Sequence, residues 1–215
     1  MHVAWISGWG VVPGALKLLT DFFPAEASHS FLPPTAESAQ ACVKSDLTIG
    51  WSLGALRILD AAAGGAQFAG RVWLLAPFLD FCSDHNNGGR CAVIQVKWLR
   101  RWLTRGPHAA LADFYERAGL GKPPTELPYA MEDLLAGLDR LAEPASPSLR
   151  EFVRRGLPGS WHAAVGDQDP LLEGTRICEV IAGCRLVAGA DHRAGKLFAA
   201  IAREDHARKE SADAV

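Results

Sequence analysis

The sequence lacks the long apolar run that a membrane-spanning helix requires, and its first residues contain neither a basic leader nor an extended apolar segment. Its charge is nearly balanced, because 22 Lys and Arg residues stand against 24 Asp and Glu residues, for a net charge of −2. Such a balance gives the whole molecule no electrostatic attraction for nucleic acid. We therefore predict a cytoplasmic protein that neither inserts into a membrane nor binds nucleic acid.

The sequence also lacks an organised set of cysteines. It contains five, an odd number, and no pair has C-x-x-C spacing. This pattern favours free thiols in a reducing compartment over a disulfide framework or a zinc site. There is no cluster of His and Cys ligands and no phosphate-binding glycine loop before a helix, so we expect no metal ion and no organic cofactor. The cysteines are Cys42, Cys82, Cys91, Cys178 and Cys184.

What the chain does contain is an alternation of short apolar runs and helical patterns. Its 215 residues and apolar fraction of 49% suit one α/β domain with an insertion. The alternation predicts a mostly parallel, open sheet flanked by helices. Strands are expected at residues 2–7, 28–32, 46–49, 71–76, 161–165 and 184–187, helices at 53–63, 172–181 and 195–203 and from about residue 15, and a short linker at 35–45.

The alternation stops after Pro77 and resumes near Gly159, with a polar loop, several prolines and helical patterns between them. We interpret residues 79–158 as a helical cap inserted into a core of residues 1–78 and 159–205, followed by a polar tail at 206–215. Cap helices are expected at residues 92–104, 109–118, 129–141 and 148–155.

The first expected cap helix is amphipathic and basic. A basic helix surface is either a solvated face or a docking surface for an acidic partner, and both interpretations stay open here. The expected apolar side holds Ile94, Trp98, Leu99, Trp102 and Leu103, and the basic residues are Lys97, Arg100 and Arg101 on this helix with Arg150, Arg154 and Arg155 on the last one.

The most informative stretch is Gly50-Trp51-Ser52-Leu53-Gly54. It joins an apolar, β-branched strand pattern to a helical pattern, which is the context of a nucleophile elbow. A serine hydroxyl is a weak nucleophile, so it needs exposure at a sharp turn, a neighbouring base, and backbone N–H groups for the developing oxyanion. The alternative is an ordinary strand-to-helix turn.

Two further groups follow later strands. The loop from Gly166 to Pro170 carries Asp167 and Asp169, and the last strand is followed by His192. In an open parallel sheet such loops meet at one edge, so the three side chains are expected to converge. The chain order serine, acid, histidine is that of α/β-hydrolases and differs from that of chymotrypsin and subtilisin.

These residues carry a resemblance. With Gly8-Trp9-Gly10, Gly50-Trp51-Ser52-Leu53-Gly54, Gly166 to Asp169, and His192, the chain resembles α/β-hydrolases and, within them, the pimeloyl-acyl carrier protein methyl ester esterases of biotin synthesis. It departs from that family at Ser7, where the family usually has histidine. The family's N-terminal β-hairpin is also missing and the linker at residues 35–45 is short for the usual helix, so we expect a trimmed α/β-hydrolase fold with an inserted helical cap.

The resemblance implies roles for individual residues. Ser52 is the implied nucleophile, His192 the base, and Asp169 the acid, because the family's acid stands three residues after the glycine. Asp167 remains an alternative acid, as does Asp80, because some hydrolases of this fold place the acid after the equivalent strand. The implied oxyanion hole consists of the backbone N–H groups of Trp9 and Leu53.

The expected activity is that of a serine carboxylester hydrolase. The resemblance further implies an acyl carrier protein as partner, bound by Arg100, Arg101, Arg154 and Arg155, with Trp98 and Trp102 lining an acyl channel. For these tryptophans the alternative is packing between cap and core. A broad esterase or thioesterase would use the same triad, and a hydrolase-fold protein that binds its ligand without cleaving it is the alternative from another class.

Overall fold

The computed structural model describes residues 1–213, with side chains described through residue 205. Within this part of the chain lies one parallel sheet of six strands in the order β2-β1-β3-β4-β5-β6. The four central strands are short, largely buried apolar runs, as strands covered on both faces require, whereas the two edge strands are half-buried or exposed. The predicted parallel, open sheet is therefore confirmed. The strands are β1 (His2–Ile6), β2 (Ser28–Leu32), β3 (Leu47–Trp51), β4 (Arg71–Leu75), β5 (Trp161–Gly166) and β6 (Cys184–Val187).

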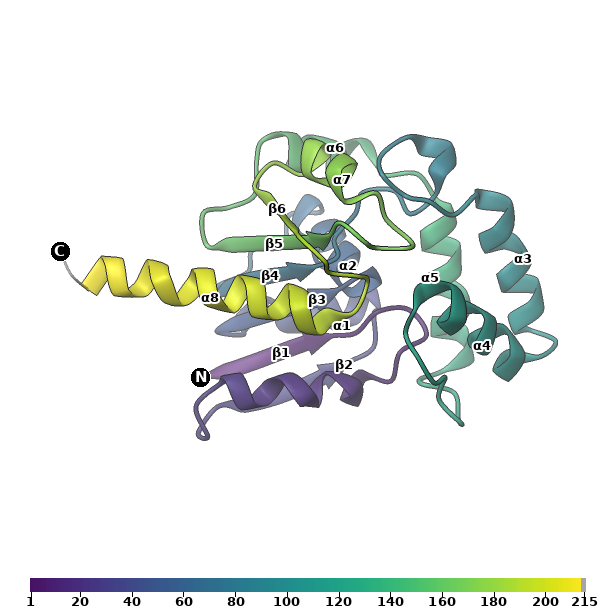
Figure 1. The fold of residues 1–215 in the computed structure, drawn as a ribbon, viewed down its shortest axis with the longest axis horizontal. Helices are drawn as coiled ribbons and strands as arrows, with labels where there is room; N and C mark the ends of the chain where they lie inside the picture. Colours follow the sequence, from purple (N-terminus) through teal and green to yellow (C-terminus); the bar gives the residue numbers. More distant parts are fainter. Residues whose placement is uncertain (214–215) are drawn as a thin grey trace.

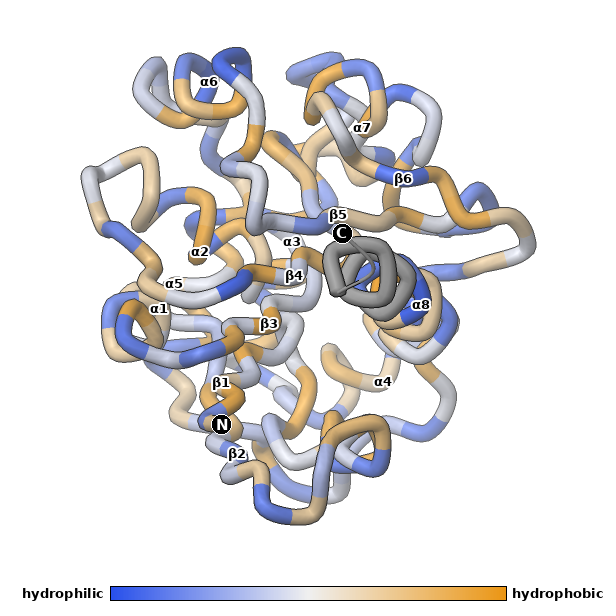
Figure 2. The backbone as a smooth tube through the Cα atoms, turned by 90° about the vertical axis from the view of Figure 1, so that its left-hand side faces the viewer, coloured by the Kyte–Doolittle hydropathy of each residue, from blue (hydrophilic) through white to orange (hydrophobic). Residues whose placement is uncertain are grey.

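Helices cover both faces of the sheet. The 3-10 helix η1 (Pro13–Phe22) and α8 (Ala194–Asp213) lie on one face, whereas α1 (Ala36–Ala41) and α2 (Leu53–Ala63) lie on the other (Figures 1 and 2). Trp5 of β1 is fully buried under the first pair, with its ring centroid 5.7 Å from that of Phe198. A short helix, α7 (Gly174–Val180), connects β5 to β6.

The region between β4 and β5 contains the helices of the expected cap. Three helices lie beyond the carboxyl ends of the strands: α3 (Val93–Leu103), α4 (Pro107–Ala118) and α5 (Met131–Ala142) (Figure 1). The short 3-10 helix η3 (Ser83–His85) precedes them, and α6 (Pro147–Arg154) returns the chain to the core, where it packs against α2. Arg140 of α5 forms two 2.8 Å hydrogen bonds to the Asp60 carboxylate of α2, which joins the cap to the core.

Two local predictions are wrong. The expected linker at residues 35–45 contains α1 and a 3-10 turn, η2 (Cys42–Lys44). The Thr35 hydroxyl accepts a 3.1 Å hydrogen bond from the Ser38 N–H and so caps α1, whose six residues are too few to show a helical apolar stripe. In addition, α8 continues well past its expected end at residue 203. The side chains of the expected polar tail, residues 206–215, lie outside the described part.

The apolar side assigned to the first cap helix is also partly wrong. Val96, Leu99 and Leu103 are the buried residues of α3, and they face α4 and α5. Trp98 is 61% exposed and Trp102 42% exposed, so neither packs between cap and core. Two neighbouring stripes of α3 fit a helical period, and the position of the other cap helices decides which one is buried.

No helix of the described residues is both long and apolar enough to cross a membrane.

Candidate active site

Ser52 lies at the sharp turn between β3 and α2. Its backbone has φ 55° and ψ −117°, a conformation that costs energy for any residue with a side chain. Glycines on either side permit this turn. A Cβ on Gly54 would stand 2.3 Å from the Ile6 carbonyl oxygen, and one on Gly50 would stand 2.8 Å from the Ala55 nitrogen. The Gly-x-Ser-x-Gly pattern thus forms a nucleophile elbow in the structure.

The structure brings together the three side chains that the sequence places after strands. The Ser52 Oγ lies 3.0 Å from the His192 Nε2, and the His192 Nδ1 lies 2.7 Å from the Asp169 Oδ2. All three residues are buried, with 7% of Ser52, 1% of His192 and none of Asp169 exposed. An ionised carboxylate only accepts hydrogen bonds, so Nδ1 carries the imidazole proton and Nε2 is free to accept the serine proton.

The carboxylate of Asp169 is held on both oxygens. Its Oδ1 accepts hydrogen bonds from the backbone N–H groups of Leu171, at 2.8 Å, and Leu172, at 3.0 Å, which leaves Oδ2 for the histidine. On the other side, the Trp51 indole N–H donates to the carbonyl oxygen of His192 at 2.8 Å. The Asp169 carboxylate and the His192 backbone are therefore each held by hydrogen bonds outside the triad.

The two alternative acids do not contact His192. Asp167 is exposed and accepts a hydrogen bond from the Gly189 N–H at 2.8 Å. Asp80 is fully buried, but its carboxylate accepts from the Ala145 N–H and pairs with the Arg150 guanidinium at 3.2 Å. Of the three candidates left by the sequence, only Asp169 has the geometry of a triad acid.

The Gly8-Trp9-Gly10 loop lies over the nucleophile. A Cβ on Gly8 would lie 3.4 Å from the Ser52 Cβ, which measures how closely the loop approaches. The Ser7 hydroxyl, at the position where the resembling family has histidine, donates to the Val11 carbonyl oxygen at 3.2 Å and closes the loop. Within residues 1–213, neither the Trp9 N–H nor the Leu53 N–H donates to a protein acceptor. Both donors are thus available to an oxyanion.

Sequence reasoning missed the cap residues that hold this loop. The hydroxyl of Tyr129 accepts a hydrogen bond from the Gly10 N–H at 2.8 Å, and the hydroxyl of Tyr115 donates to the Gly10 carbonyl oxygen at 3.1 Å. The Trp9 indole N–H donates to the Leu134 carbonyl oxygen at 2.8 Å. No motif or spacing marks these residues, because each lies more than 100 positions from its partner.

A cavity of about 430 Å³ lies beside the triad. Among its lining residues are the neighbours in sequence of the triad members, Trp51 before Ser52 and Arg193 after His192. Val11, which follows the glycine loop, forms another part of the wall. The lining is mostly apolar, and the volume of the cavity falls within the range of small-molecule sites.

In the described part of the chain, no three His, Cys, Asp or Glu side chains are placed to hold a metal ion.

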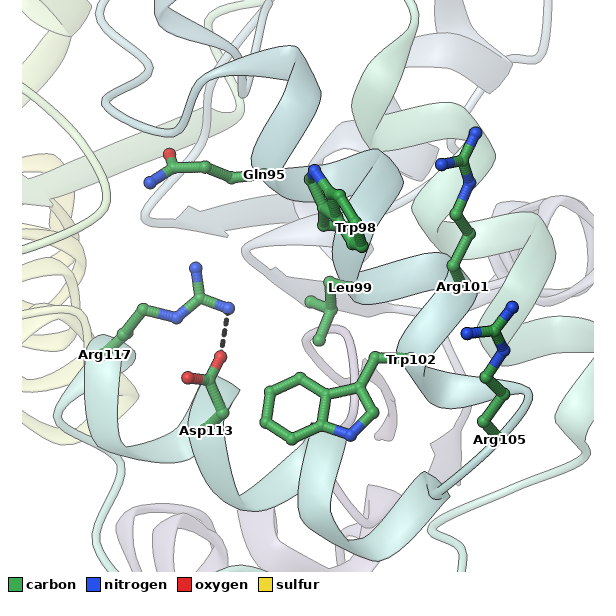
Figure 3. A pocket seen from close by; sticks show the side chains of 8 residues that line it. All are labelled: Gln95, Trp98, Leu99, Arg101, Trp102, Arg105, Asp113 and Arg117. Atoms are coloured by element: carbon green, nitrogen blue, oxygen red, sulfur yellow. Dashed lines mark ion pairs between the residues drawn. The ribbon is translucent and has the colours of Figure 1, made fainter.

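The predicted cap residues do not form one surface at the triad. Trp98, Arg101 and Trp102 line a different groove of about 660 Å³ between α3 and α4, together with Arg105 (Figure 3). None of the triad residues lines this groove. Figure 3 shows the Trp102 ring directed toward α4, next to the ion pair of Asp113 and Arg117. The Arg101 side chain points away from that ion pair.

The other predicted arginines are occupied by acidic neighbours. Arg100 makes two hydrogen bonds to the carboxylate of Asp139 on α5. Arg154 and Arg155 both pair with Glu151, each through a 2.8 Å contact from Nε. All three predicted arginines are thus engaged in ion pairs within the cap, although the single carboxylate of Glu151 balances only one of the two arginines that it binds.

Searches of the sequence against protein-family models and against curated proteins found no match. Solved structures are similar over almost the whole chain. An esterase from Exiguobacterium antarcticum has a TM-score of 0.70 and 15% identity, covering 99% of this chain and 91% of that one. An esterase from Rhodococcus sp. ECU1013 has a TM-score of 0.61 and 16% identity, covering 98% of this chain and 90% of that one.

A third similar structure is an E-2-(acetamidomethylene)succinate hydrolase, with a TM-score of 0.61 and 14% identity, covering 97% of this chain and 91% of that one. At such low identities the likeness concerns architecture and carries no information about substrate. It agrees with the parallel sheet, the elbow after β3 and the helices inserted after β4. The chain has the α/β-hydrolase fold.

Proposed function

We propose that this protein is a serine hydrolase that cleaves carboxylic esters, with Ser52 as nucleophile, His192 as base and Asp169 as acid. The observation that supports it best is the continuous path from the elbow serine through the imidazole to a buried carboxylate, with contacts of 3.0 and 2.7 Å. A serine with a purely structural role has no need for a strained backbone or for a base aligned on its hydroxyl.

The reaction proceeds in two halves. The Ser52 Oγ attacks the ester carbonyl carbon while its proton moves to the His192 Nε2, and the carboxylate of Asp169 stabilises the imidazolium. The N–H groups of Trp9 and Leu53 stabilise the oxyanion of the tetrahedral intermediate. The carbon–oxygen bond to the alcohol then breaks, the alcohol leaves with the proton from His192, and an acyl-serine ester remains. Water, deprotonated by His192, hydrolyses that ester and restores Ser52.

A covalent probe tests the proposal directly. A fluorophosphonate should add to the wild-type protein once, at Ser52, and should abolish hydrolysis of p-nitrophenyl butyrate. Intact-mass measurement and peptide mapping detect the adduct, and Ser52→Ala serves as the blank for both. An adduct at no residue, together with unchanged hydrolysis by Ser52→Ala, would refute the proposal and favour a protein of this fold that binds a ligand without cleaving it.

The narrower proposal concerns the substrate. By the resemblance of its motifs, we propose a methyl ester of a carrier-bound acyl chain such as pimeloyl-acyl carrier protein. The apolar cavity beside Trp51 offers a place for the chain. The carrier is an acidic partner. Two arginines of the exposed tryptophan groove, Arg101 and Arg105, form no ion pair with a carboxylate among the described side chains, whereas Arg117 pairs with Asp113. These two arginines replace Arg100, Arg154 and Arg155 as the expected carrier contacts.

Ionic strength separates docking from chemistry. Activity on a carrier-bound methyl ester should fall steeply with salt and in Arg101→Glu, while hydrolysis of p-nitrophenyl butyrate should change little. Arg203→Glu is the matched control, because it reverses a charge on α8, away from the cap (Figure 1). Equal effects on both substrates would refute carrier docking. A panel that adds acyl thioesters decides between an esterase and a thioesterase, since one triad serves both.

A further inference from the structure

The cap contributes directly to the shape of the glycine loop over Ser52. Both backbone groups of Gly10 are bound by tyrosines of the cap region, with the N–H on Tyr129 at 2.8 Å and the carbonyl oxygen on Tyr115 at 3.1 Å. Tyr115 belongs to α4, and Tyr129 lies in the segment between α4 and α5. Gly10 itself has a φ of +70°, so a residue in an unusual conformation is fixed from outside the core.

The side chain of Trp9 is held by the same helices. Its indole N–H donates to the Leu134 carbonyl oxygen of α5 at 2.8 Å, and its ring packs edge to face on Phe114 of α4 with a centroid separation of 4.7 Å. Trp9 is only 2% exposed. Since the Trp9 N–H is one of the two free donors at Ser52, the contacts that fix this residue also fix the direction of a donor.

A glycine inside α5 touches both donor residues. A Cβ on Gly137 would lie 2.7 Å from the Trp9 Cδ1 and 3.1 Å from the Leu53 Cδ2. Glycine in a helix interior is unfavourable relative to alanine, so its presence here has to be explained by the close approach. The residues it approaches are the two whose N–H groups have no protein acceptor beside Ser52, so α5 packs against both of them.

The two tyrosine hydroxyls keep their protons over the working pH range. Burial raises the pKa of Tyr115 to about 12, and burial also raises the pKa of Tyr129 above its usual range. The Tyr115 hydroxyl therefore remains a donor to the Gly10 carbonyl oxygen. This hydrogen bond is therefore retained as the pH rises to the mildly alkaline range of the ester assays.

We propose that the cap positions the oxyanion hole, with Tyr115, Tyr129 and Gly137 as positioning residues, so that catalysis requires a docked cap. This inference rests on the proposed function, because an oxyanion forms only if Ser52 attacks a carbonyl. None of the three residues hydrogen-bonds to a triad side chain, although Tyr115 also lines the cavity beside the triad. They act through the N–H directions of Trp9 and Leu53, and a small misplacement of such donors lowers the rate of the chemical step more than it weakens binding.

The variants are Tyr129→Phe, which removes one hydroxyl, and Gly137→Ala, which adds one methyl group. Each should lower kcat for p-nitrophenyl butyrate on the order of 10-fold with KM changed less than about twofold, since full loss of an oxyanion donor costs about 100- to 1,000-fold. Gly159→Ala is the matched control, because its Cβ would meet no atom within 4 Å. Melting temperatures and circular dichroism verify folding, and Tyr115→Phe replaces Gly137→Ala if that variant does not fold.

A transition-state analogue distinguishes positioning from a merely structural role. Butylboronic acid adds to Ser52 and places an oxygen in the oxyanion hole, whereas butyramide binds without forming a tetrahedral adduct. Affinity for the boronic acid should fall in parallel with kcat in both variants, and affinity for butyramide should not. Variants with wild-type kcat, or an equal loss of affinity for both ligands, would overturn the inference. If the wild-type protein shows no turnover that depends on Ser52, the proposed function itself has failed.

Discussion

The assignment of Asp169 as the acid gives a sharp prediction for Asp169→Asn. The wild-type Oδ1 accepts two backbone N–H groups, from Leu171 and Leu172, and an amide can satisfy those donors only with its oxygen. The amide NH₂ must then face the His192 Nδ1 at the place where the carboxylate oxygen lay 2.7 Å away. Because an NH₂ group donates, Nδ1 must accept, and the imidazole proton moves to Nε2. That nitrogen can no longer take the serine proton.

The magnitude follows from the loss of the base. An imidazole locked in the wrong tautomer lowers kcat by about 10⁴-fold in serine hydrolases with the same arrangement, which is about 5 kcal/mol in activation free energy. Folding should change little, because the substitution keeps the size and shape of the side chain and its two bonds to the backbone. The loss should therefore appear in kcat, with KM and melting temperature close to those of the wild-type protein.

The assay is hydrolysis of p-nitrophenyl butyrate at pH 8, with the three aspartates compared side by side. Asp167→Asn should retain activity within about twofold, because Asp167 is exposed and its carboxylate accepts from the Gly189 N–H and not from the imidazole. Asp80→Asn weakens the ion pair between the fully buried Asp80 and the exposed Arg150 guanidinium, and it should lower the melting temperature more than the kcat. If Asp169→Asn keeps more than about a tenth of the wild-type kcat while Asp80→Asn loses it, the acid assignment is wrong.

Other predictions concern stability and thiol reactivity. Gly54→Ala should destabilise the protein by about 3 kcal/mol or more, since its Cβ would meet backbone oxygen at 2.3 Å, while Gly64→Ala, with contacts of 3.4 Å, should be nearly neutral in denaturant titrations. Arg140→Met should cost about 1–3 kcal/mol of unfolding free energy by leaving Asp60 without its partner, which thermal melts against an Arg154→Met control would reveal. Burial raises the pKa of Cys42 to about 11 and that of Cys82 to about 12, so iodoacetamide at pH 8 should modify these two thiols only after unfolding, as mass spectrometry can detect.

The core of the fold was predictable because its signals are local. Five consecutive residues around Ser52 predict the elbow, and short apolar runs predict the parallel strands. The position of His192 followed from the rule that loops after parallel strands meet at one edge. Neighbouring residues in the sequence did not identify which of the three aspartates is the triad acid. Asp167 and Asp169 differ by two positions, and only the direction of the loop after β5 decides which carboxylate reaches the imidazole.

The cap was predictable as a set of helices but not as a surface. On α3, the stripe through Trp98 and Trp102 and the stripe through Leu99 and Leu103 both satisfy the helical period. Which stripe is buried depends on where α4 and α5 pack, and the structure buries the leucines. Likewise, pairing of Arg100 with Asp139 joins two different helices, so no count of charges along the chain could reveal that this arginine is neutralised.

The contacts between the cap and the glycine loop predict what happens when the cap is replaced by that of another protein of this fold. A fold that hosts many activities can vary substrate choice through its inserted segment, which favours exchange. Here the contacts of Gly10 and Trp9 with the cap span more than 100 positions of sequence, so a foreign cap would remove them together with the old substrate surface. Such a chimera could lose activity for two reasons. Either an oxyanion donor is misplaced, or the new cap forms a pocket that does not fit the substrate. Retaining Tyr115, Tyr129 and Gly137 in the graft separates these two causes, because it keeps the contacts to Gly10 and Trp9 while the other cap residues change.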